Sequence, residues 1–365
     1  MRAVLLVVLA GCFNPDAKPN QPCTDWCPPP ETCIAGTCRV DEGARTPNYA
    51  FVTSERREMI RENVFKLDEW CQELARRGNL TGEFAAWMST SQQSMATRLA
   101  TVGARGWIRP DGKPFADTVE DIFAGRTYYP LRIADDGADV GLLDDNVATG
   151  TEANGTASAA TCGDFIAPPA DAAVGIGKAD AGFMWWTALQ STRCSEAAHV
   201  YCFGLDRKNS VAAPSSEPKQ KRVFVTKNTY TKRPPSDADL ICRNEASGAT
   251  TFIALVATTT QSAQERLAGA TGPWARTDGV VVTKDMATFD APLELAFDGT
   301  RIPSGEVWFG AKSLADKATV DRNCDDWGSG GSVRTGQSNR SVGAAPFDTL
   351  SGNCGGEYHY YCAER

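Results

Sequence analysis

Hydrophobic residues recur at helical spacing in two parts of the chain. In the first part the steps are 4, 3, 4 and 3 residues, along Ile60, Val64, Leu67, Cys71 and Leu74. This is the apolar stripe of an amphipathic helix that ends at Gly78, and it places Cys71 on the buried face. In the second part Ser236 and Asp239 are typical of an N-cap and its capping-box acid, and they predict a shorter helix through Cys242.

Further helices and strands follow each of these segments in the same order. A second helix is predicted at 93–102 and again at 261–270. Runs rich in β-branched and aromatic residues predict strands at 222–226, 279–283 and 358–362, which open, centre and close one module. We expect the first and last strands of that module to pair.

The cysteines reveal an internal repeat. After Cys12, the remaining twelve of the 13 cysteines form three groups of four. The steps within the second group are 91, 32 and 8 residues, and within the third they are 82, 30 and 8. Such agreement indicates a duplicated module. The groups are Cys23, Cys27, Cys33 and Cys38; then Cys71, Cys162, Cys194 and Cys202; then Cys242, Cys324, Cys354 and Cys362.

The residues between the cysteines repeat as well. AFVT at 50–53 matches VFVT at 223–226, and HVYC at 199–202 matches HYYC at 359–362. A stretch rich in Pro, Ser and Lys without apolar periodicity separates the copies, which is typical of a linker. We therefore predict a signal peptide at 1–11, a tether at 12–46, a first module at 47–207, a linker at 208–221 and a second module at 222–365.

The N-terminal segment is typical of an export signal. One positive charge precedes an apolar run that is too short to span a bilayer. Leu9-Ala10-Gly11-Cys12 resembles the lipobox of bacterial lipoproteins, in which the cysteine is acylated after cleavage. The alternative is an ordinary signal with an incidental cysteine. Phe13 follows in place of an aspartate, which by resemblance to Gram-negative sorting favours the outer membrane.

Charge and composition narrow the class of protein. The 37 Lys and Arg against 45 Asp and Glu leave a net charge of −8, so we expect no nucleic-acid partner. A hydrophobic content of 42% with 22% charged residues is ordinary for folded domains. Thirteen cysteines with two histidines are typical of an oxidising compartment, which indicates an exported protein.

The first cysteine group, Cys23, Cys27, Cys33 and Cys38, surrounds a run of three prolines. Four cysteines at such spacing can be drawn as a zinc site. In an exported chain a knot of two disulfides is the stronger hypothesis, and it would act as a stiff spacer. We therefore expect no metal and no cofactor.

The architecture of the two modules resembles the C-type-lectin-like fold. Glu306-Val307-Trp308-Phe309-Gly310 is similar to the central Trp-Ile-Gly strand of that fold. A bacterial branch of this fold, which occurs as repeated domains in surface lipoproteins, has a Cys-polar-polar-Trp motif. Two segments are similar to that motif: Cys324-Asp325-Asp326-Trp327 and Cys162-Gly163-Asp164-Phe165. The resemblance implies an α+β fold, with helices packed on a small, mostly antiparallel sheet and long irregular loops in each disulfide-braced module.

The resemblance also implies a disulfide pairing and raises a doubt about calcium. Four cysteines in each module allow three connectivities, and the sequence does not choose among them. By analogy with the fold, the bridges are Cys71–Cys202, Cys162–Cys194, Cys242–Cys362 and Cys324–Cys354. The Glu-Pro-Asn or Gln-Pro-Asp triplet and the Trp-Asn-Asp of calcium-dependent lectins are missing from the sequence. The usual calcium–sugar mechanism is therefore in doubt, and the sequence leaves calcium dependence open.

Several residues are candidates for chemistry, each with a structural alternative. Asp325 and Asp326 offer hydrogen-bond acceptors beside the aromatic ring of Trp327, a combination that can bind a sugar. A buried position of Trp327 in the hydrophobic core explains this residue equally well. His199 and His359 occupy equivalent strand positions, where packing is favoured over general-base catalysis. The acidic loop at 135–145 can bind calcium, although a solvated loop is favoured. We expect no catalytic residue.

The expected function is binding. A lipid-anchored protein at the outer membrane, facing the periplasm or the exterior, would recognise an extracellular glycan or protein through loops of its tandem modules. The main alternative is a structural envelope protein without a small ligand, and a remote one is a glycan-processing enzyme. A concave pocket lined by aromatic and polar residues would favour binding, whereas flat loops would favour the structural role.

Overall fold

A computed structural model describes residues 22, 31–34, 37–40, 46–142, 145–166, 169, 171–215, 217, 219–302, 305–328, 330–343 and 345–365. The chain divides into two compact units, 1–46 and 47–365. In the first unit β1 (Glu31–Ile34) and β2 (Thr37–Val40) form an antiparallel hairpin with Cys33 opposite Cys38. The structure does not describe the predicted acylation site Cys12 or the predicted knot residues Cys23 and Cys27. The side chains of Cys33 and Cys38 also lie outside the described residues.

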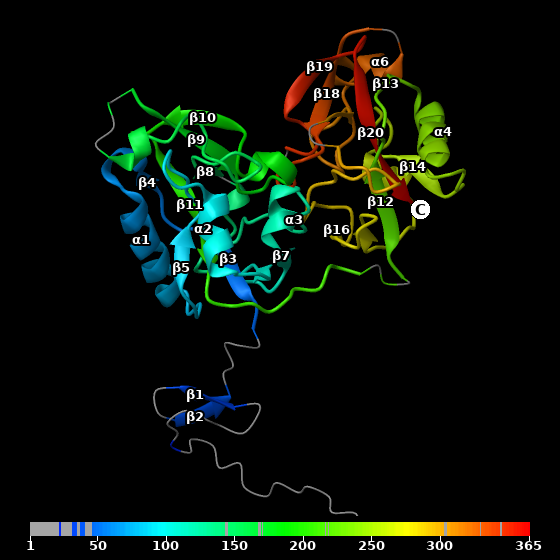
Figure 1. The fold of residues 1–365 in the computed structure, drawn as a ribbon. Coiled ribbons are helices and arrows are strands. Elements are labelled where there is room, and N and C mark those ends of the chain that lie inside the picture. The colour runs from blue at the N-terminus through cyan, green and yellow to red at the C-terminus, as the bar shows by residue number, and fades with distance from the viewer. Residues whose placement is uncertain are drawn as a thin grey trace, which may run out of the picture. The chain divides into compact units, whose positions relative to one another are not determined.

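The second unit contains two nine-stranded sheets, one in each predicted module (Figure 1). Below, module 1 denotes 47–207 and module 2 denotes 222–365. Module 1 holds β3 (Asn48–Val52), β4 (Arg57–Glu58), β5 (Phe84–Ala86), β6 (Trp107–Ile108), β7 (Pro114–Ala116), β8 (Asn146–Ala148), β9 (Ala173–Lys178), β10 (Gln190–Arg193) and β11 (Ala197–Gly204). Module 2 holds β12 (Lys221–Val225), β13 (Tyr230–Thr231), β14 (Phe252–Ala254), β15 (Trp274–Ala275), β16 (Val281–Thr283), β17 (Glu306–Trp308), β18 (Ser332–Gln337), β19 (Leu350–Asn353) and β20 (Glu357–Glu364).

The two sheets share one topology. The order is β10-β9-β8-β11-β3-β6-β7 in module 1 and β19-β18-β17-β20-β12-β15-β16 in module 2. The first and last strands pair antiparallel in both, as predicted, with Cys202 opposite Phe51 and Cys362 opposite Phe224. Among the strand pairs that the structure describes, two in each module are parallel: β8–β11 and β3–β6 in module 1, and β17–β20 and β12–β15 in module 2. The other described strand pairs are antiparallel. The mostly antiparallel α+β architecture expected from the sequence is therefore present.

The first helix of module 1 begins later than its apolar stripe. Ile60 lies in a separate 3-10 turn, η2 (Met59–Arg61), and α1 (Val64–Arg77) starts where the Asn63 side chain accepts the Lys66 amide. The predicted end at Gly78 and the burial of Cys71 are confirmed. The remaining helical segments are α2 (Met95–Val102), α3 (Val119–Phe123), η3 (Val140–Leu142), η4 (Gly163–Phe165) and η5 (Phe183–Trp186).

The first helix of module 2 corrects the proposed capping box. α4 (Pro235–Glu245) begins before Ser236, with Pro235 in its first turn. Asp239 instead accepts the Ala254 amide at 2.9 Å and pairs with Arg266 at 2.7 Å. The second helix of this module, α5 (Ala263–Arg266), is much shorter than the predicted 261–270. The other helical segments are η6 (Val320–Arg322) and α6 (Cys324–Trp327).

Four disulfides brace the second unit. Cys71–Cys202 and Cys242–Cys362 join the first helix of each module to its last strand. Cys162–Cys194 and Cys324–Cys354 close shorter loops. These are the four pairs that the resemblance implies. They indicate an oxidising, exported environment.

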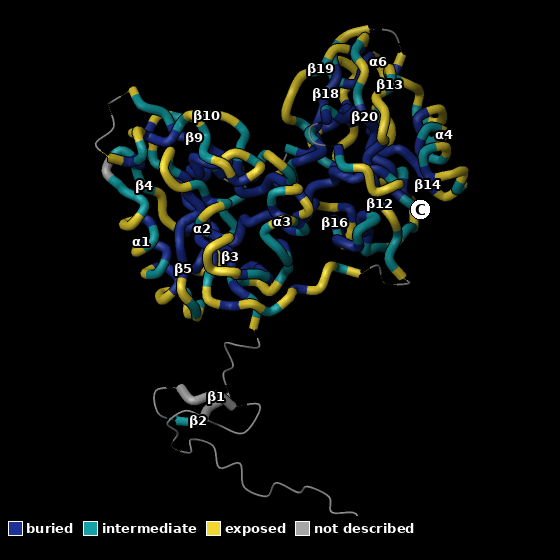
Figure 2. Tube along the Cα trace, in the orientation of Figure 1, coloured by how far each residue is buried: buried dark blue, intermediate teal, exposed yellow. Residues whose placement is uncertain are grey.

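The two modules dock on each other within the second unit. The linker lies against module 1, where the amide of buried Val211 donates to Asp117 Oδ1 at 2.7 Å. Tyr129 of module 1 packs with Val280 and Ala291 of module 2 in a small shared core. Figure 2 shows buried chain continuing through the region between α3 and β16. The tandem modules are therefore one compact body.

Candidate functional site

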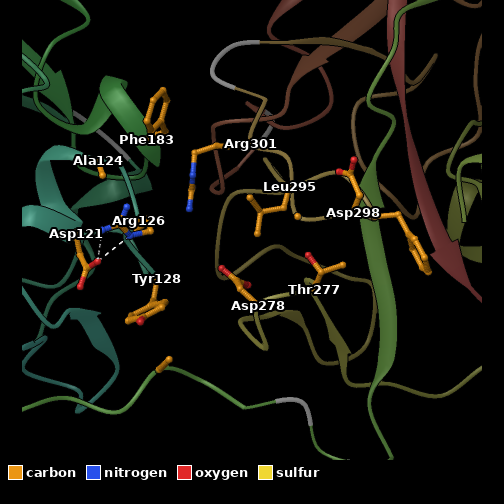
Figure 3. A pocket seen from close by; sticks show the side chains of 13 residues that line it. Asp121, Ala124, Arg126, Tyr128, Phe183, Thr277, Asp278, Leu295, Asp298 and Arg301 are labelled. Carbon is orange, nitrogen blue, oxygen red and sulfur yellow. Dashed lines mark hydrogen bonds and ion pairs between the residues drawn. The ribbon is translucent and has the colours of Figure 1, made fainter.

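A cleft of about 850 Å³ lies where the modules meet. Figure 3 shows its two walls facing each other, with module 1 residues on one side and module 2 residues on the other. The wall from module 1 is formed by Asp121, Ala124, Arg126, Tyr128 and Phe183. The linker adds Ala213, and module 2 supplies Thr277, Asp278, Leu295, Phe297, Asp298, Gly299 and Arg301.

The module 1 wall is built on the short helix α3. Thr118 and Asp121 form a reciprocal capping box, which fixes the start of the helix. Asp121 also accepts from Arg126 at 2.7 Å, so the exposed guanidinium is held at the rim. Burial opposes ionisation of Asp121, but Thr118 and Arg126 together hold the pKa of its carboxyl below the ordinary value.

Phe183 forms the upper part of the same wall. It opens η5 and is half-buried. A Cβ at Gly125, which has a φ of +69°, would overlap the Phe183 ring. Glycine at position 125 therefore allows both the left-handed turn after α3 and the close approach of the ring. The Arg301 guanidinium from module 2 lies 5.7 Å from the ring centroid, a cation–π contact across the cleft.

The opposite wall depends on a fully buried arginine. Arg276 donates to Asp278 Oδ2 at 2.7 Å and to the Pro292 carbonyl at 3.0 Å. It also reaches the Thr127 carbonyl of module 1 at 3.4 Å. Burial alone would raise the pKa of Asp278, but the Arg276 guanidinium holds it below the ordinary value. Asp278 thus presents an ionised, firmly oriented carboxylate to the cleft.

A buried carboxylate supports the wall behind Arg301. Glu294 is 0% exposed, pairs with Arg301 and lies 3.5 Å from Arg276 Nη1. Burial raises the pKa of Glu294, against the opposing effects of Arg301 and Arg276. Module 1 has the same pair with the charges exchanged, because Arg132 lies 3.1 Å from Asp139 at the matching bridge. The exchange gives the two modules complementary rather than identical faces.

The cleft combines apolar rings with neutralised ion pairs. Phe183, Tyr128 and Phe297 offer ring surface, and Arg126 and Arg301 offer planar donors. Thr277 Oγ1 is buried and has no hydrogen-bond partner among the described residues. Each cleft carboxylate is already matched by a cation. This arrangement suits a ligand with apolar faces edged by neutral polar groups.

The sequence-predicted residues Asp325, Asp326 and Trp327 lie elsewhere. Cys324 to Trp327 all have positive φ, a full left-handed turn that the counterpart at Cys162 to Phe165 repeats. Trp327 is 3% exposed and donates to the Ala257 carbonyl at 2.8 Å, so it takes the core role and offers no open ring to a sugar. This corrects the expectation for Trp327.

The two aspartates of this turn differ in their roles. Asp326 accepts both the amide and the hydroxyl of Thr259, at 2.9 and 3.0 Å, as Asp164 does from Ser91 in module 1. These bonds help to offset the roughly 1–2 kcal/mol that each L-residue costs in the left-handed region. Asp325 is exposed. The structure therefore gives Asp326 a fold-supporting role and leaves Asp325 at the surface, outside the cleft.

Other candidates take structural positions. The Nδ1 atoms of His199 and His359 lie 2.6 and 2.7 Å from the Thr53 and Thr226 carbonyls, between paired strands. In the acidic loop Asp135 accepts from Ser54, whereas Asp145 pairs with Lys178 and Arg340. Within the described ranges, no group of three or more His, Cys, Asp or Glu side chains is arranged to hold a metal ion.

Sequence reasoning missed the cleft because its walls come from different modules. Phe183 stands beside Met184-Trp185-Trp186, a run that attracts attention as aromatic, but nothing in the sequence shows that Arg301 faces it. Across the described part of the chain, no helix is long and apolar enough to cross a membrane. Neither a family model nor a curated protein sequence matches the chain.

Proposed function

We propose that this protein is an exported, lipid-anchored binding protein that holds a segment of an extracellular glycan between two lectin-like modules. The observation that carries the proposal is the cleft itself, with aromatic rings and oriented polar groups in a space of about 850 Å³. Sugars present apolar C–H faces edged by hydroxyl groups. Phe183 and Tyr128 match the faces, and Asp278 and Arg126 match the hydroxyls.

Two features support the lectin-like assignment. Both modules join their first and last strands, and in both a disulfide ties the first helix to the last strand. The second disulfide of each module closes a loop that ends eight residues before the last cysteine. Since the modules are docked, we propose one composite site rather than two independent ones.

The charge states in the cleft favour binding over hydrolysis. A glycosidase needs one carboxyl with a raised pKa as general acid beside an ionised partner. The pKa values of Asp121 and Asp278 are both lowered, by their arginine neighbours against the effect of burial. Glu294 has a raised pKa but is fully buried behind Arg301. Asp121 and Asp278 therefore serve as hydrogen-bond acceptors.

Removing a cleft side chain is expected to weaken glycan binding. Arg126→Ala removes an exposed donor whose ion pair contributes little to stability, and Phe183→Ala removes a ring surface. Each charge-assisted hydrogen bond is worth about 1.5–3 kcal/mol, so we expect Arg126→Ala to lower affinity about tenfold or more. The measurement is a screen of the intact oxidised chain on glycan arrays and isolated envelope polysaccharide, followed by titration of the variants.

Two controls locate the site. Arg322→Ala removes an exposed arginine that does not line the cleft, and it should leave affinity unchanged. Asp325→Asn tests the loop that the sequence favoured. A loss of binding in Asp325→Asn with full binding in the cleft variants would move the site to that loop. Failure of every glycan to bind would instead favour the structural envelope role.

The proposed anchor is tested separately. Two or more acyl chains at Cys12 would hold the chain stably on a membrane, at about 0.8 kcal/mol for each buried methylene. Cys12→Ser should therefore move the protein from the detergent phase to the aqueous phase on phase partition, and Cys12→Ala should do the same. If Cys12→Ser leaves the protein in the detergent phase, the lipoprotein assignment must be abandoned.

A further inference from the structure

The modules meet through equivalent loops. β9 and β18 end at Lys178 and Gln337, which pair with the first residues of β8 and β17. Three residues further on lie Ala181 and Arg340, so these two positions correspond in the repeat. They form an antiparallel bridge with each other. Equivalent residues that face each other mark a local two-fold axis, as in an isologous dimer.

The hydrogen bonds around this bridge repeat in both directions. The Gly182 amide donates to the Asn339 carbonyl at 2.9 Å. In the reverse direction Ser341, the counterpart of Gly182, donates its hydroxyl to the carbonyl of Asp180 at 2.7 Å. Asp180 and Asn339 also correspond in the repeat. The same loop surface is therefore used twice, once by each module.

We infer that this loop surface, 179–183 in module 1 and 338–342 in module 2, is a self-association surface whose fitting partner is another copy of the module. In this chain the partner is the tandem neighbour. Each module supplies what the other needs to complete the contact, so the association does not depend on the covalent linker. This inference is independent of the glycan proposal, because it concerns how the cleft is assembled.

Charges at the axis select unlike modules. Arg340 Nε lies 2.6 Å from Asp180 Oδ1, and Arg340 Nη2 lies 2.6 Å from Asp145 Oδ2. A pair of two first modules would place Ala181 where Arg340 stands, which would leave the buried Asp180 without its cation and Asp145 with Lys178 alone. A pair of two second modules would place Arg340 against Arg340, with Asn339 in place of Asp180. Both like pairs bury uncompensated charge, which disfavours them.

Cutting the linker in the folded chain tests the inference. A protease site inserted after exposed Ser215 allows cleavage of the full-length, oxidised protein in detergent, and native mass spectrometry then reports which fragments remain together. We expect a one-to-one complex of the two halves at micromolar concentration. Release of separate halves on cleavage would overturn the self-association surface. The appearance of like pairs would overturn the charge selection.

A charge-reversal variant tests whether the residues at the local two-fold axis hold the cut halves together. Arg340→Glu places an acid against Asp180 and Asp145, and it should weaken association of the cut halves about a hundredfold or more. Arg334→Glu is the matched control, because Arg334 pairs with Asp348 inside module 2. Loss of the complex in Arg334→Glu and not in Arg340→Glu would contradict the assignment. The wild-type cleavage result stands by itself if either variant does not fold.

Discussion

Replacing Arg340 by alanine is expected to lower the free energy of unfolding by about 3–5 kcal/mol, because it leaves a buried carboxylate without its cation. The Arg340 side chain is 13% exposed and holds Asp180, which is fully buried, and Asp145, which is 11% exposed. Without the guanidinium, no cation faces the Asp180 carboxylate among the described residues, and it keeps hydrogen bonds from the Ser341 and Val342 amides and one shared with Asp145. Chemical denaturation followed by tryptophan fluorescence measures the loss.

The size of this effect depends on pH. Burial, together with the neighbouring Asp145, raises the pKa of Asp180 from 3.8 to about 6, although Arg340 opposes the shift. The folded state therefore binds more protons than the unfolded state between these values, and this contribution to stability falls as pH rises through that window. Removing Arg340 raises the folded pKa further. We expect a larger loss at about pH 8 than at about pH 5.

A double-mutant cycle separates the ion pair from other effects of the substitution. Asp180→Asn combined with Arg340→Ala removes the stranded charge, so the double variant should be more stable than Arg340→Ala alone. Asp145 supplies the remaining charge, and burial opposes its ionisation while Asp180, Arg340 and Lys178 keep its pKa low. Additive single losses, with no dependence on pH, would show that Arg340 acts through packing alone.

Removal of a long-loop disulfide is the second large effect. Cys71–Cys202 spans 131 residues and Cys162–Cys194 spans 32 residues. In the chain-entropy model these bridges contribute about 5 and about 4 kcal/mol respectively, because a longer loop restricts the unfolded chain more. The paired Cys71→Ala and Cys202→Ala variant should therefore lose more stability than the paired Cys162→Ala and Cys194→Ala variant.

The same comparison between a long and a short disulfide loop can be made in module 2. Cys242–Cys362 spans 120 residues and Cys324–Cys354 spans 30 residues. The same ranking is expected from the free energies of unfolding in denaturant. A greater loss for the short bridge in both modules would show that its contacts around the left-handed turn outweigh chain entropy.

Much of the fold could be predicted from covalent and periodic signals. The cysteine steps and the repeated strand sequences are local or countable, so they revealed two copies and their paired terminal strands. Helix ends were less predictable where side chains serve distant partners. Asp239 has the position of a capping acid, yet it binds Ala254 and Arg266 from later segments. The local sequence pattern cannot show whether Asp239 caps its own helix or binds a distant segment.

The candidate site could not be predicted from the sequence for a different reason. Glu294, Arg301 and Arg340 look like surface charges, because the chain is 22% charged and nothing in the sequence marks Glu294 as buried or the two arginines as largely buried. Their burial follows from the docking of one module on the other, which no periodicity records. Trp327 was ambiguous because an exposed and a buried tryptophan have the same sequence context. The unusual left-handed turn that places it is specified by a contact with Thr259, which is 67 residues away from Asp326.

Hydrogen exchange at the module junction tests the docked arrangement most directly. The amides that form hydrogen bonds across the modules include these three: Gly182 to the Asn339 carbonyl, Val342 to Asp180 and Val281 to the Tyr129 hydroxyl. In the wild-type chain we predict that they exchange about as slowly as the amides of β11 and β20, and that Arg340→Ala accelerates Gly182 and Val342 first. Rapid exchange of all three in the wild type, with β11 and β20 fully protected, would contradict the docked modules and the cleft between them.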